Sequence, residues 1–460
     1  MSQTLAALGI TPEAIRAYDQ RIPRYTSYPT APSWTTAVGP MQWRDHVRAT
    51  SANARDLSLY VHIPFCEKRC LFCGCNVIIT PKHELANNYL DVLAKEVKLL
   101  RDAWRGTGKV IQLHLGGGTP NYLRPDEMAR LISILSEAFE FSPTAERSIE
   151  VDPRMASPED ITRLAKDNGF SRISFGVQDF HEDTQHAIGR EQTLECTFAN
   201  VAAARQSGFR GVNIDLIYGL PRQTTSSWSS SLDRVCKLRP DRIALYNFAY
   251  LPGRLPHQRT LVESEMPNPS AKLQMFIEAH ERLTEAGWNF IGMDHYALAD
   301  DSLSLAQQAG TLRRNFMGYT TLRGTNLLGF GTSAISDFEG AFAQNVKKLS
   351  QYNSLVGEGL LPIEHGLILS DDDKLRRFMI EELMCNGRLQ FDGEYGHKVA
   401  ELVNAELQAL QSLADDGLIE LGHDSVRVLP KGRLFLRNIA AVFDAYLKRS
   451  STAPMFSRAV

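Results

Sequence analysis

The sequence predicts an α/β fold: a partial (βα)6-type parallel barrel between an N-terminal arm and a mainly helical, winged-helix-like C-terminal domain. From residue 57 onward, short apolar, β-branched or aromatic runs alternate with longer stretches of helical periodicity. Each run ends in polar or glycine-rich residues, and from about residue 360 the alternation gives way to helical stretches around one small hairpin. Alternating strands and helices form parallel sheets with right-handed crossovers.

Six strand-like runs make up the predicted barrel. They are 57–63, 111–115, 148–152, 172–177, 212–218 and 242–248. Between the first two, apolar residues recur every three or four positions from Tyr89 to Trp104, which indicates a helix with one apolar face. Ser157 is a predicted helix cap with Asp160 three residues later. Six units fall short of the eight that close a complete barrel, so we expect an open one.

Polar chemistry gathers where the predicted strands end. The residues are His62 and the cysteines after it, Gly116 to Thr119, Glu150 and Asp152, Gln178, Asp215, and Asn247. In parallel α/β barrels the active site is built at the C-terminal ends of the strands. Six separate segments converging on that rim therefore predict an active site there.

The predicted domains are 1–50, an N-terminal arm covering the active site; 51–350, the partial barrel; and 351–460, the mainly helical domain. The segment RYTSYPTAPSW in the arm has no sustained period. Its Tyr25, Tyr28 and Trp34 are costly to leave in water, which favours an ordered arm over a linker. In the C-terminal domain acidic and basic residues alternate without a basic stripe, which disfavours DNA binding.

The composition is that of an ordinary globular protein, with 43% hydrophobic and 22% charged residues among 460. A net charge of -3 argues against a general nucleic-acid or membrane-surface binder. The N-terminal segment lacks the features of a secretory signal, and no apolar run approaches the roughly 18 residues of a membrane-spanning helix. We therefore expect a cytoplasmic protein, in which clustered thiols favour metal binding or catalysis over disulfides.

The segment CEKRCLFCGC holds four of the seven cysteines, spaced C-x3-C-x2-C-x-C from Cys66 to Cys75. A structural zinc site is one interpretation, but zinc motifs usually combine C-x2-C pairs from separate segments. Soft thiolates from one tight loop suit an iron–sulfur cube better. Three such ligands would leave one iron open to a substrate. Cys196, Cys236 and Cys385 are scattered and are expected to be buried apolar residues.

The C-x3-C-x2-C spacing after a strand, with Phe72 before the third cysteine, resembles the signature of radical S-adenosylmethionine enzymes. The resemblance implies that Cys66, Cys70 and Cys73 bind a 4Fe-4S cluster whose free iron chelates S-adenosylmethionine. One electron from the cluster then cleaves the sulfonium, and the resulting 5′-deoxyadenosyl radical abstracts hydrogen from an unactivated carbon.

Further motifs resemble the oxygen-independent coproporphyrinogen III oxidases of bacterial haem biosynthesis. They are PRYTSYPT, YVHIPFC, CGCN, GGGTP, SIEVDPR, GVQDF, NIDLIYGLP, IGMDH, RNF with GYTT, and the GTSAIS segment. The resemblance implies oxidative decarboxylation of two propionates of coproporphyrinogen III to vinyl groups, giving protoporphyrinogen IX. It also implies two molecules of S-adenosylmethionine, an electron-donating redox protein and an electron acceptor. We expect a monomer.

Three other functions remain open on the sequence. A haem chaperone of the same superfamily would bind haem without decarboxylating a porphyrinogen, but such proteins usually have an aromatic residue at the position of Cys75 and lack the arm. A radical methylase would need a second cysteine placed to carry a methyl group. A zinc-stabilised DNA-binding regulator would use the winged-helix pattern.

The resemblance also implies roles for individual residues. The S-adenosylmethionine on the cluster would contact Tyr60, Gly117, Glu150 and Ile335. The second would contact Phe72, Gly118, Thr119, Gln178, Arg190, Asp215 and Ala249. Elementary chemistry agrees in part, because glycines admit close approach to backbone amides and an arginine can pair bidentately with a carboxylate.

Three further features of the site concern the role of Cys75, a departure from the family pattern, and the residues that bind the propionates. Cys75 is a candidate catalytic residue that shields the cluster or takes part in proton or electron transfer, with a packing thiol as the alternative. Met317 stands where the family pattern has glutamine, and a thioether cannot replace an amide's donors and acceptors. Candidates for binding the propionates are Arg24, Arg313 and Arg314.

Overall fold

The computed structural model describes residues 9–54, 56–322 and 326–449. Contacts divide the chain into two compact units. The barrel unit comprises Thr35–Met275 and Gly324–Ile368, and the second unit comprises Met1–Trp34, Phe276–Arg323 and Leu369–Val460. The three domains expected from the sequence, with limits at residues 50 and 350, and the covering role of the arm stay predictions.

All six predicted barrel strands form and lie side by side in sequence order. They are β1 (Asp56–Ile63), β4 (Lys109–Gly117), β5 (Phe141–Val151), β6 (Arg172–Gln178), β7 (Gly211–Tyr218) and β8 (Arg242–Asn247). Each pairs in parallel with the next. On the other side of β1 lies the parallel strand β13 (Asn326–Phe330). The antiparallel strands β14 (Ile335–Phe338), β15 (Ala341–Asn345) and β16 (Ile363–Ile368) follow β13.

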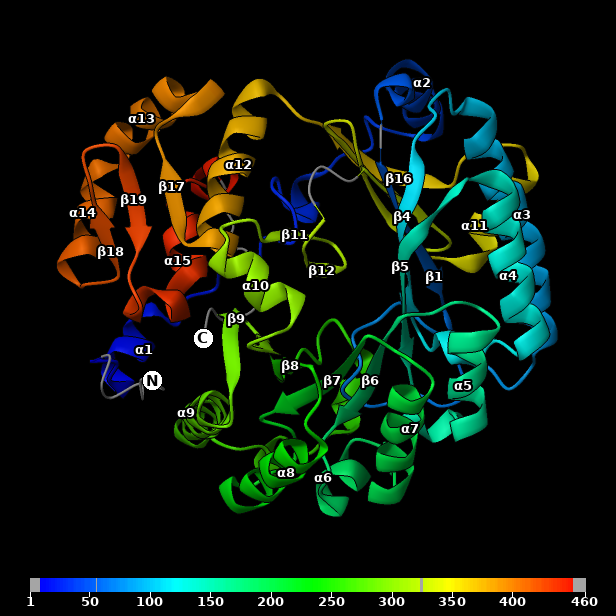
Figure 1. Ribbon diagram of the computed structural model, residues 1–460, viewed down its shortest axis with the longest axis horizontal. Helices are drawn as coiled ribbons and strands as arrows, with labels where there is room; N and C mark the ends of the chain where they lie inside the picture. The colour runs from blue at the N-terminus through cyan, green and yellow to red at the C-terminus, as the bar shows by residue number, and fades with distance from the viewer. Residues whose placement is uncertain (1–8, 55, 323–325, 450–460) are drawn as a thin grey trace. The chain divides into compact units, whose positions relative to one another are not determined.

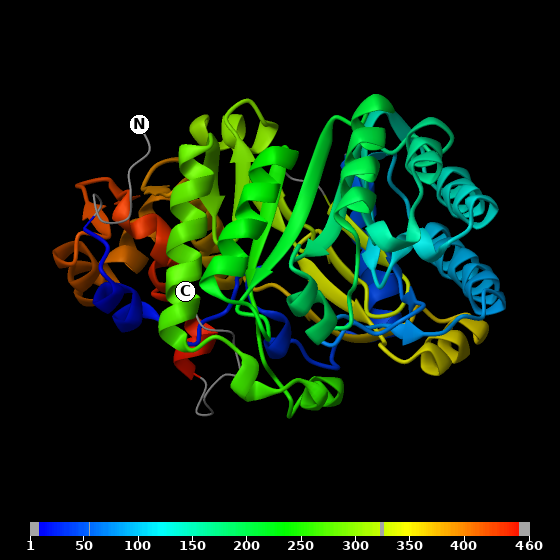
Figure 2. The same ribbon diagram turned by 90° about the horizontal axis from the view of Figure 1, so that it is seen from below.

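The linear strand order leaves the barrel open, which confirms the predicted partial barrel. Its helices are α2 (Pro40–Thr50), α3 (Glu84–Ala103), α4 (Pro125–Ala138), α5 (Pro158–Lys166), α6 (Glu182–Ala187), α7 (Leu194–Gln206), α8 (Thr225–Leu238) and α11 (Leu349–Gly357). Figures 1 and 2 show α3 and α4 along the outer side of β4 and β5. The predicted apolar face of α3 is buried, with Leu93 at 0% and Val97 at 1% exposure.

Helix α5 begins as predicted, because the Ser157 hydroxyl accepts a hydrogen bond from the Asp160 backbone N–H at 3.2 Å. This bond satisfies one of the free donors at the helix start. Helix α9 (Pro269–Glu285) spans the limit between the two units. None of the helices in the described ranges combines the length and the apolar character needed to cross a membrane.

The register of the parallel strands carries polar residues from strand to strand along one row. Tyr60 of β1 lies opposite His114 of β4, and His114 lies opposite Ser148 of β5. Farther along the sheet, Gly176 of β6 lies opposite Asp215 of β7. Because residues in register point to the same face, this row delivers polar groups from neighbouring strands to one region of the barrel.

The second unit is mainly helical in its C-terminal part, as predicted. It contains α10 (Ser302–Gln308), α12 (Asp371–Asn386), α13 (Gly396–Ala405), α14 (Leu407–Asp415), α15 (Leu436–Ala441) and α16 (Ala445–Arg449). A three-stranded antiparallel sheet joins them, with β19 (Ser425–Val428) between β17 (Arg388–Gln390) and β18 (Ile419–Leu421) (Figure 1). Two antiparallel pairs complete the unit: β9 (Trp288–Gly292) with β10 (His295–Leu298), and β11 (Arg313–Asn315) with β12 (Gly318–Thr320).

The N-terminal arm is ordered, as the aromatic residues predicted. Tyr25, Tyr28 and Trp34 are only 5%, 2% and 6% exposed. The Tyr25 hydroxyl donates to Asp444 at 3.1 Å, and the Tyr28 hydroxyl accepts from the Ala445 backbone N–H at 3.1 Å. Two helices that the sequence did not predict, α1 (Pro12–Tyr18) and α2, lie before and after RYTSYPTAPSW. Both begin at a proline, which fits the first helical position.

Candidate active site

The cysteine loop is held at both ends by a short parallel pairing. Cys66 ends β2 (Phe65–Cys66), which pairs with β3 (Ile78–Ile79) beyond the loop. The Ile78 N–H donates to the Pro64 carbonyl at 2.7 Å, and the Thr80 N–H donates to the Cys66 carbonyl at 3.0 Å. The loop therefore leaves from and returns to the same place directly after β1.

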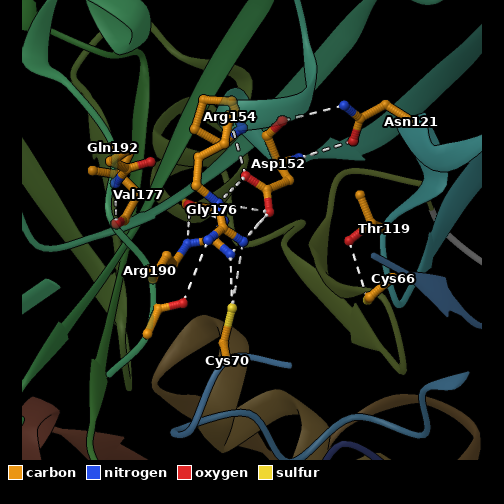
Figure 3. Close-up of polar contacts among 12 residues, drawn as sticks. Cys66, Cys70, Thr119, Asn121, Asp152, Arg154, Gly176, Val177, Arg190 and Gln192 are labelled. Carbon is orange, nitrogen blue, oxygen red and sulfur yellow. Dashed lines mark hydrogen bonds and ion pairs between the residues drawn. The ribbon is translucent and has the colours of Figure 1, made fainter. Parts of the chain in front are cut away.

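Each of the three predicted ligand sulfurs has a polar neighbour (Figure 3 shows those of Cys66 and Cys70). Cys66 Sγ lies 3.2 Å from Thr119 Oγ1, and Cys70 Sγ accepts from Arg190 Nη1 at 3.3 Å. Cys73 Sγ accepts from the Cys75 backbone N–H at 3.4 Å. Cys70 is buried, Cys66 and Cys73 are half-buried, and Cys75 is exposed.

The thiols of the cysteine loop differ in how readily they ionise. Across the described ranges, no three histidine, cysteine or acidic side chains converge as the ligands of one metal ion would. Metal ligation by cysteine requires the thiolate form. Hydrogen bonding with Cys75 lowers the pKa of Cys73, whereas burial raises the pKa of Cys66 to about 11. Cys73 is thus more readily ionised than Cys66.

The GGGTP turn packs its backbone against the start of the cysteine loop. The Gly118 N–H donates to the Ile63 carbonyl at 2.8 Å, and the Thr119 N–H donates to the Phe65 carbonyl at 2.9 Å. A Cβ atom on Gly118 would lie 2.8 Å from the Phe65 carbonyl oxygen. Gly117 has a φ of +115°, and a Cβ there would lie 2.7 Å from His62 Nδ1. Both positions require glycine.

Glu150 lies at the end of β5 and accepts hydrogen bonds from two neighbouring segments. The Gly117 N–H donates to it at 3.3 Å, and His114 Nε2 lies 3.4 Å from its other oxygen. Its side chain is 45% exposed, so the carboxylate remains accessible to a ligand. Burial opposes ionisation, but the His114 and Gly117 contacts outweigh it and lower the pKa of Glu150. The group is an anion at neutral pH.

Tyr60 connects this carboxylate region to the cysteine loop through His62. The Tyr60 ring stacks on His114 with a centroid distance of 5.9 Å, and its hydroxyl lies 3.2 Å from His62 Nδ1. His62 Nε2 lies 2.9 Å from the Asn76 carbonyl oxygen, which can only accept, so Nε2 carries the hydrogen. Burial lowers the pKa of His62 and keeps the imidazole neutral.

Asp215 of β7 forms a second acidic centre inside the barrel. Its Oδ1 accepts from Asn213 Nδ2 at 2.7 Å and from the Ser174 hydroxyl at 3.2 Å. Burial, with the charge of Glu150 as the second cause, raises the pKa of Asp215 to about 7. Near neutral pH this carboxyl group therefore exchanges between donor and acceptor forms.

Arg190 and Gln178 lie near the end of β6. Arg190 is only 7% exposed and donates from Nε to the Gly176 carbonyl at 3.0 Å and from Nη1 to Asp152 at 3.1 Å. Gln178 has a φ of +71°, an uncommon conformation for a residue with a side chain. Strained backbone of this kind gathers at binding sites.

A buried glutamine that the sequence did not single out joins two of the predicted site residues. Gln258 is 0% exposed, and its Nε2 donates to the Phe72 and Ala249 carbonyls, each at 3.2 Å. The adjacent His257 Nε2 lies 2.8 Å from the Cys73 carbonyl oxygen. A lone glutamine in a loop carries no motif, so no sequence signal could have identified it.

The structure thus brings most of the predicted site residues of the barrel unit to the strand ends around the cysteine loop. Ile335 begins β14, opposite Gln344 of β15, and is half-buried. Met317 lies in the second unit, between β11 and β12, where its N–H donates to Asn315 Oδ1 at 2.8 Å. In that unit Arg24 pairs with Asp294, and Arg313 pairs with Glu382.

Comparison with known proteins identifies two family models in the chain. The Radical SAM superfamily model matches residues 60–235, and the HemN C-terminal domain model matches residues 369–435. The first match contains the cysteine loop, the GGGTP turn, Glu150, Gln178, Arg190 and Asp215.

Relatives match over nearly the full length. The oxygen-independent coproporphyrinogen III oxidase of Escherichia coli strain K12 is 43% identical over 449 residues, covering 97% of each chain. The protein of the same name from Synechocystis is 41% identical and covers 100% of each chain. The solved structure of the Escherichia coli enzyme, described as a radical SAM enzyme, superposes with a TM-score of 0.87, covering 93% of this chain and 100% of that one.

Proposed function

Because the chain belongs to the oxygen-independent coproporphyrinogen III oxidases, a radical SAM family, we propose that it decarboxylates two propionates of coproporphyrinogen III to vinyl groups, giving protoporphyrinogen IX. The observation that carries the proposal is the near full-length match to these oxidases, at 43% identity, in a chain whose cysteine loop stands at the strand ends. Each vinyl group forms when a propionate loses one hydrogen atom, carbon dioxide and one electron.

The cofactors are a 4Fe-4S cluster and S-adenosylmethionine, as in the radical SAM superfamily. We propose that Cys66, Cys70 and Cys73 hold the cluster. When bound, this pair supplies the 5′-deoxyadenosyl radical that takes the hydrogen atom from the β-carbon of the propionate. The electron released with carbon dioxide passes to an acceptor, whose identity, like that of the electron donor, stays open.

The proposed contacts to the first S-adenosylmethionine suit its charged and polar groups. The Glu150 carboxylate is ionised and accessible, so it can accept hydrogen bonds from the ligand's ammonium or ribose hydroxyls. Gly117 has no side chain to cover its backbone, and a Cβ at this position would collide with His62. Tyr60 and Ile335 would contribute ring and backbone contacts from β1 and β14.

A second S-adenosylmethionine is proposed on the Asp215 side of the barrel. Asp215 is shared between its ionised and protonated forms near pH 7 in the free protein, so a ligand hydroxyl or ammonium would favour ionisation. The other proposed contacts are Phe72, Gly118, Thr119, Gln178, Arg190 and Ala249. Gln258 would fix the backbones of Phe72 and Ala249 from behind.

For Cys75 we propose a role through its neighbour. Hydrogen bonding between the two side chains raises the pKa of Cys75 well above its ordinary value and lowers that of Cys73. Cys73 is therefore the more readily ionised of the two thiols, which suits one thiol that binds iron and one that does not.

A tetra-anionic substrate needs cationic partners, and the three predicted arginines differ in the partners that they already have. Arg24 and Arg313 each pair with a carboxylate. Arg314 donates instead to the Arg24 carbonyl, and its buried Nε has no hydrogen-bond partner among the described residues. We propose that Arg314 binds a substrate propionate.

An anaerobic assay on reconstituted protein tests the function. The protein receives S-adenosylmethionine, a reductant, an electron acceptor and coproporphyrinogen III, and both products are quantified. We expect protoporphyrinogen with about two 5′-deoxyadenosines per molecule, since each ring needs one radical. Deoxyadenosine without vinyl product would indicate another substrate. Neither product, from protein with an intact cluster and tightly bound haem, would favour the haem chaperone.

A further inference from the structure

Two arginines converge on one of the proposed cluster ligands. Arg190 Nη1 lies 3.3 Å and Arg154 Nη2 lies 3.5 Å from Cys70 Sγ (Figure 3). Arg190 comes from the loop after α6, whereas Arg154 comes from the short 3-10 helix Pro153–Met155 that follows β5. Within the described ranges, neither Cys66 nor Cys73 accepts a hydrogen bond from an arginine.

Asp152 fixes Arg154 in this position. The Arg154 guanidinium donates from Nε to both carboxylate oxygens, at 3.0 and 3.2 Å, and from Nη2 to Oδ2 at 2.6 Å. The same carboxylate accepts the Arg154 backbone N–H at 3.1 Å and Arg190 Nη1 at 3.1 Å. Asp152 therefore holds both guanidiniums, and the three residues together carry one net positive charge beside Cys70.

Hydrogen bonds from two sides hold the backbone at Asp152 and Pro153. Asn121 forms two hydrogen bonds with the Asp152 backbone, from its Nδ2 to the carbonyl at 3.2 Å and from the Asp152 N–H to its Oδ1 at 2.9 Å. Asn200 Nδ2 and Cys196 Sγ both donate to the Pro153 carbonyl at 3.0 Å. The Asp152 side chain is only 5% exposed and that of Arg154 is 19% exposed. A guanidinium fixed in this way cannot easily turn from the sulfur to solvent.

We propose that Arg154 is a positioning residue that raises the reduction potential of the cluster through its hydrogen bond to the Cys70 sulfur. The inference rests on the proposed function, since it requires Cys70 to bind iron. Hydrogen bonds to ligand sulfurs and nearby charge set the potentials of iron–sulfur clusters. A cation and an N–H donor next to a thiolate stabilise the extra electron of the reduced cluster, so removing them makes reduction harder.

Arg154→Met tests the proposal, because methionine fills space without charge or N–H donors. At the wild-type midpoint potential, we expect a reduced-to-oxidised ratio about tenfold lower, which is a downward shift of about 59 mV for a one-electron couple. The readout is anaerobic redox titration of the reconstituted cluster, followed by electron paramagnetic resonance. Iron and sulfide content are measured on each sample, which keeps loss of the cluster separate from a change in its potential.

Two further variants sharpen the test. Arg154→Lys keeps the charge but loses the planar fork that binds Asp152, so a smaller downward shift is expected. Arg163→Met is the matched control, because this substitution removes the same charge. Arg163 lies on α5, and its side chain is 54% exposed. Its midpoint potential should equal that of the wild type, since exposed charges are screened by salt.

The outcomes separate the two proposals. A full cluster with the wild-type midpoint in Arg154→Met, or an equal shift in Arg163→Met, would overturn the role of Arg154. If only Arg154→Met loses iron, the lysine variant decides: a lower midpoint supports the proposal and an unchanged one overturns it. Loss of iron in both variants would assign Arg154 to cluster assembly instead. Wild-type protein that holds no iron and sulfide would overturn the proposed function, and the inference with it.

Discussion

Glu150 carries the only charged side chain among the proposed contacts of the first S-adenosylmethionine. Glu150→Gln keeps its shape and removes its charge. We expect the affinity for S-adenosylmethionine to fall at least about tenfold, because hydrogen bonds to charged groups contribute roughly 1.5–3 kcal/mol. Equilibrium binding to the reconstituted protein measures this, with iron content unchanged.

The control for this prediction is Glu140→Gln. Glu140 immediately precedes β5, at the strand end opposite Glu150, and its side chain is 66% exposed beside Lys109. The substitution removes the same charge from the same unit, so the affinity of this variant for S-adenosylmethionine should equal that of the wild type. Equal binding by Glu150→Gln and the wild type would refute the contact.

Substitution of Gly117 tests whether the backbone at this position requires glycine. In Gly117→Ala, a Cβ at 2.7 Å from His62 Nδ1 must displace the imidazole, and a φ of +115° strains any L-residue. We expect the free energy of unfolding to fall by at least about 1–2 kcal/mol. Denaturant unfolding measures this. Gly253→Ala, where a Cβ would meet nothing within 4 Å, is the control and should be nearly neutral.

At this scale the sequence could place residues but not their partners. The cysteine spacing, the glycine run and Glu150 stand out because each breaks an apolar pattern at the end of a strand. The contact of Arg154 with Cys70 joins residues 84 positions apart, and Gln258 reaches Phe72 across 186 positions. No periodicity carries such information, because it depends on how separate loops meet.

Helix α3 is attached to the sheet by a buried carboxylate in addition to its apolar face. Glu96, only 2% exposed, accepts from the Gly331 N–H at 2.8 Å, from Asn345 Nδ2 at 2.6 Å and from the Tyr352 hydroxyl at 2.6 Å. These donors come from the residue that follows β13, from β15 and from α11. One side chain therefore connects four elements of the barrel unit.

This network predicts a pH-dependent stability. Burial raises the pKa of Glu96 from 4.5 to about 7, although the three donors oppose the shift. The folded protein therefore retains a proton that the unfolded chain loses above about pH 4.5, and the associated stability disappears as pH rises toward 7. Between pH 5 and 7 we expect the free energy of unfolding of the wild type to fall by about 1 kcal/mol per pH unit relative to that of Glu96→Gln.

Thermal or denaturant unfolding at several pH values measures the difference between the two proteins. Glu137→Gln removes an exposed carboxylate of α4 and should leave the pH profile of the wild type unchanged. Parallel profiles for the wild type and Glu96→Gln would show that Glu96 titrates alike in the folded and unfolded states.

Helices and strands were more predictable than contacts because the signals that define them, apolar runs and apolar periodicity, lie within one short segment. All six barrel strands follow runs of apolar and β-branched residues, and α3 follows its apolar period from Tyr89 onward. Helices α1 and α2 were not predicted, because each is short and contains few apolar residues among charged and polar ones. Their start signals, Pro12 after Thr11 and Pro40 after Gly39, were present in the sequence.

At the scale of the whole molecule, chain order and spatial grouping differ. Residues up to Trp34 group with the C-terminal part, whereas Thr35 already belongs to the barrel unit through its bridge to Gly366. Two consecutive residues thus belong to different units. The sequence shows no break in composition at this point, so the transition could not be predicted from it.

The grouping predicts that damage to the arm destabilises the second unit selectively. Tyr28 is 2% exposed, and its ring lies 6.0 Å from that of Tyr446. Tyr28→Ala should cost about 3–5 kcal/mol as a buried large-to-small change. Tyr28→Phe keeps the ring but leaves the Ala445 N–H without its acceptor, so about 1 kcal/mol is expected.

Hydrogen exchange resolves where the stability is lost. In Tyr28→Ala, amides of α12 and α15 should exchange faster, while those of β4 to β7 should keep their wild-type protection, because local stability follows cooperative units. Tyr28→Phe should show the same pattern with a smaller effect. Faster exchange of equal size in both units would mean that they unfold as one, and the arm would then support the whole chain rather than the unit in which it is buried.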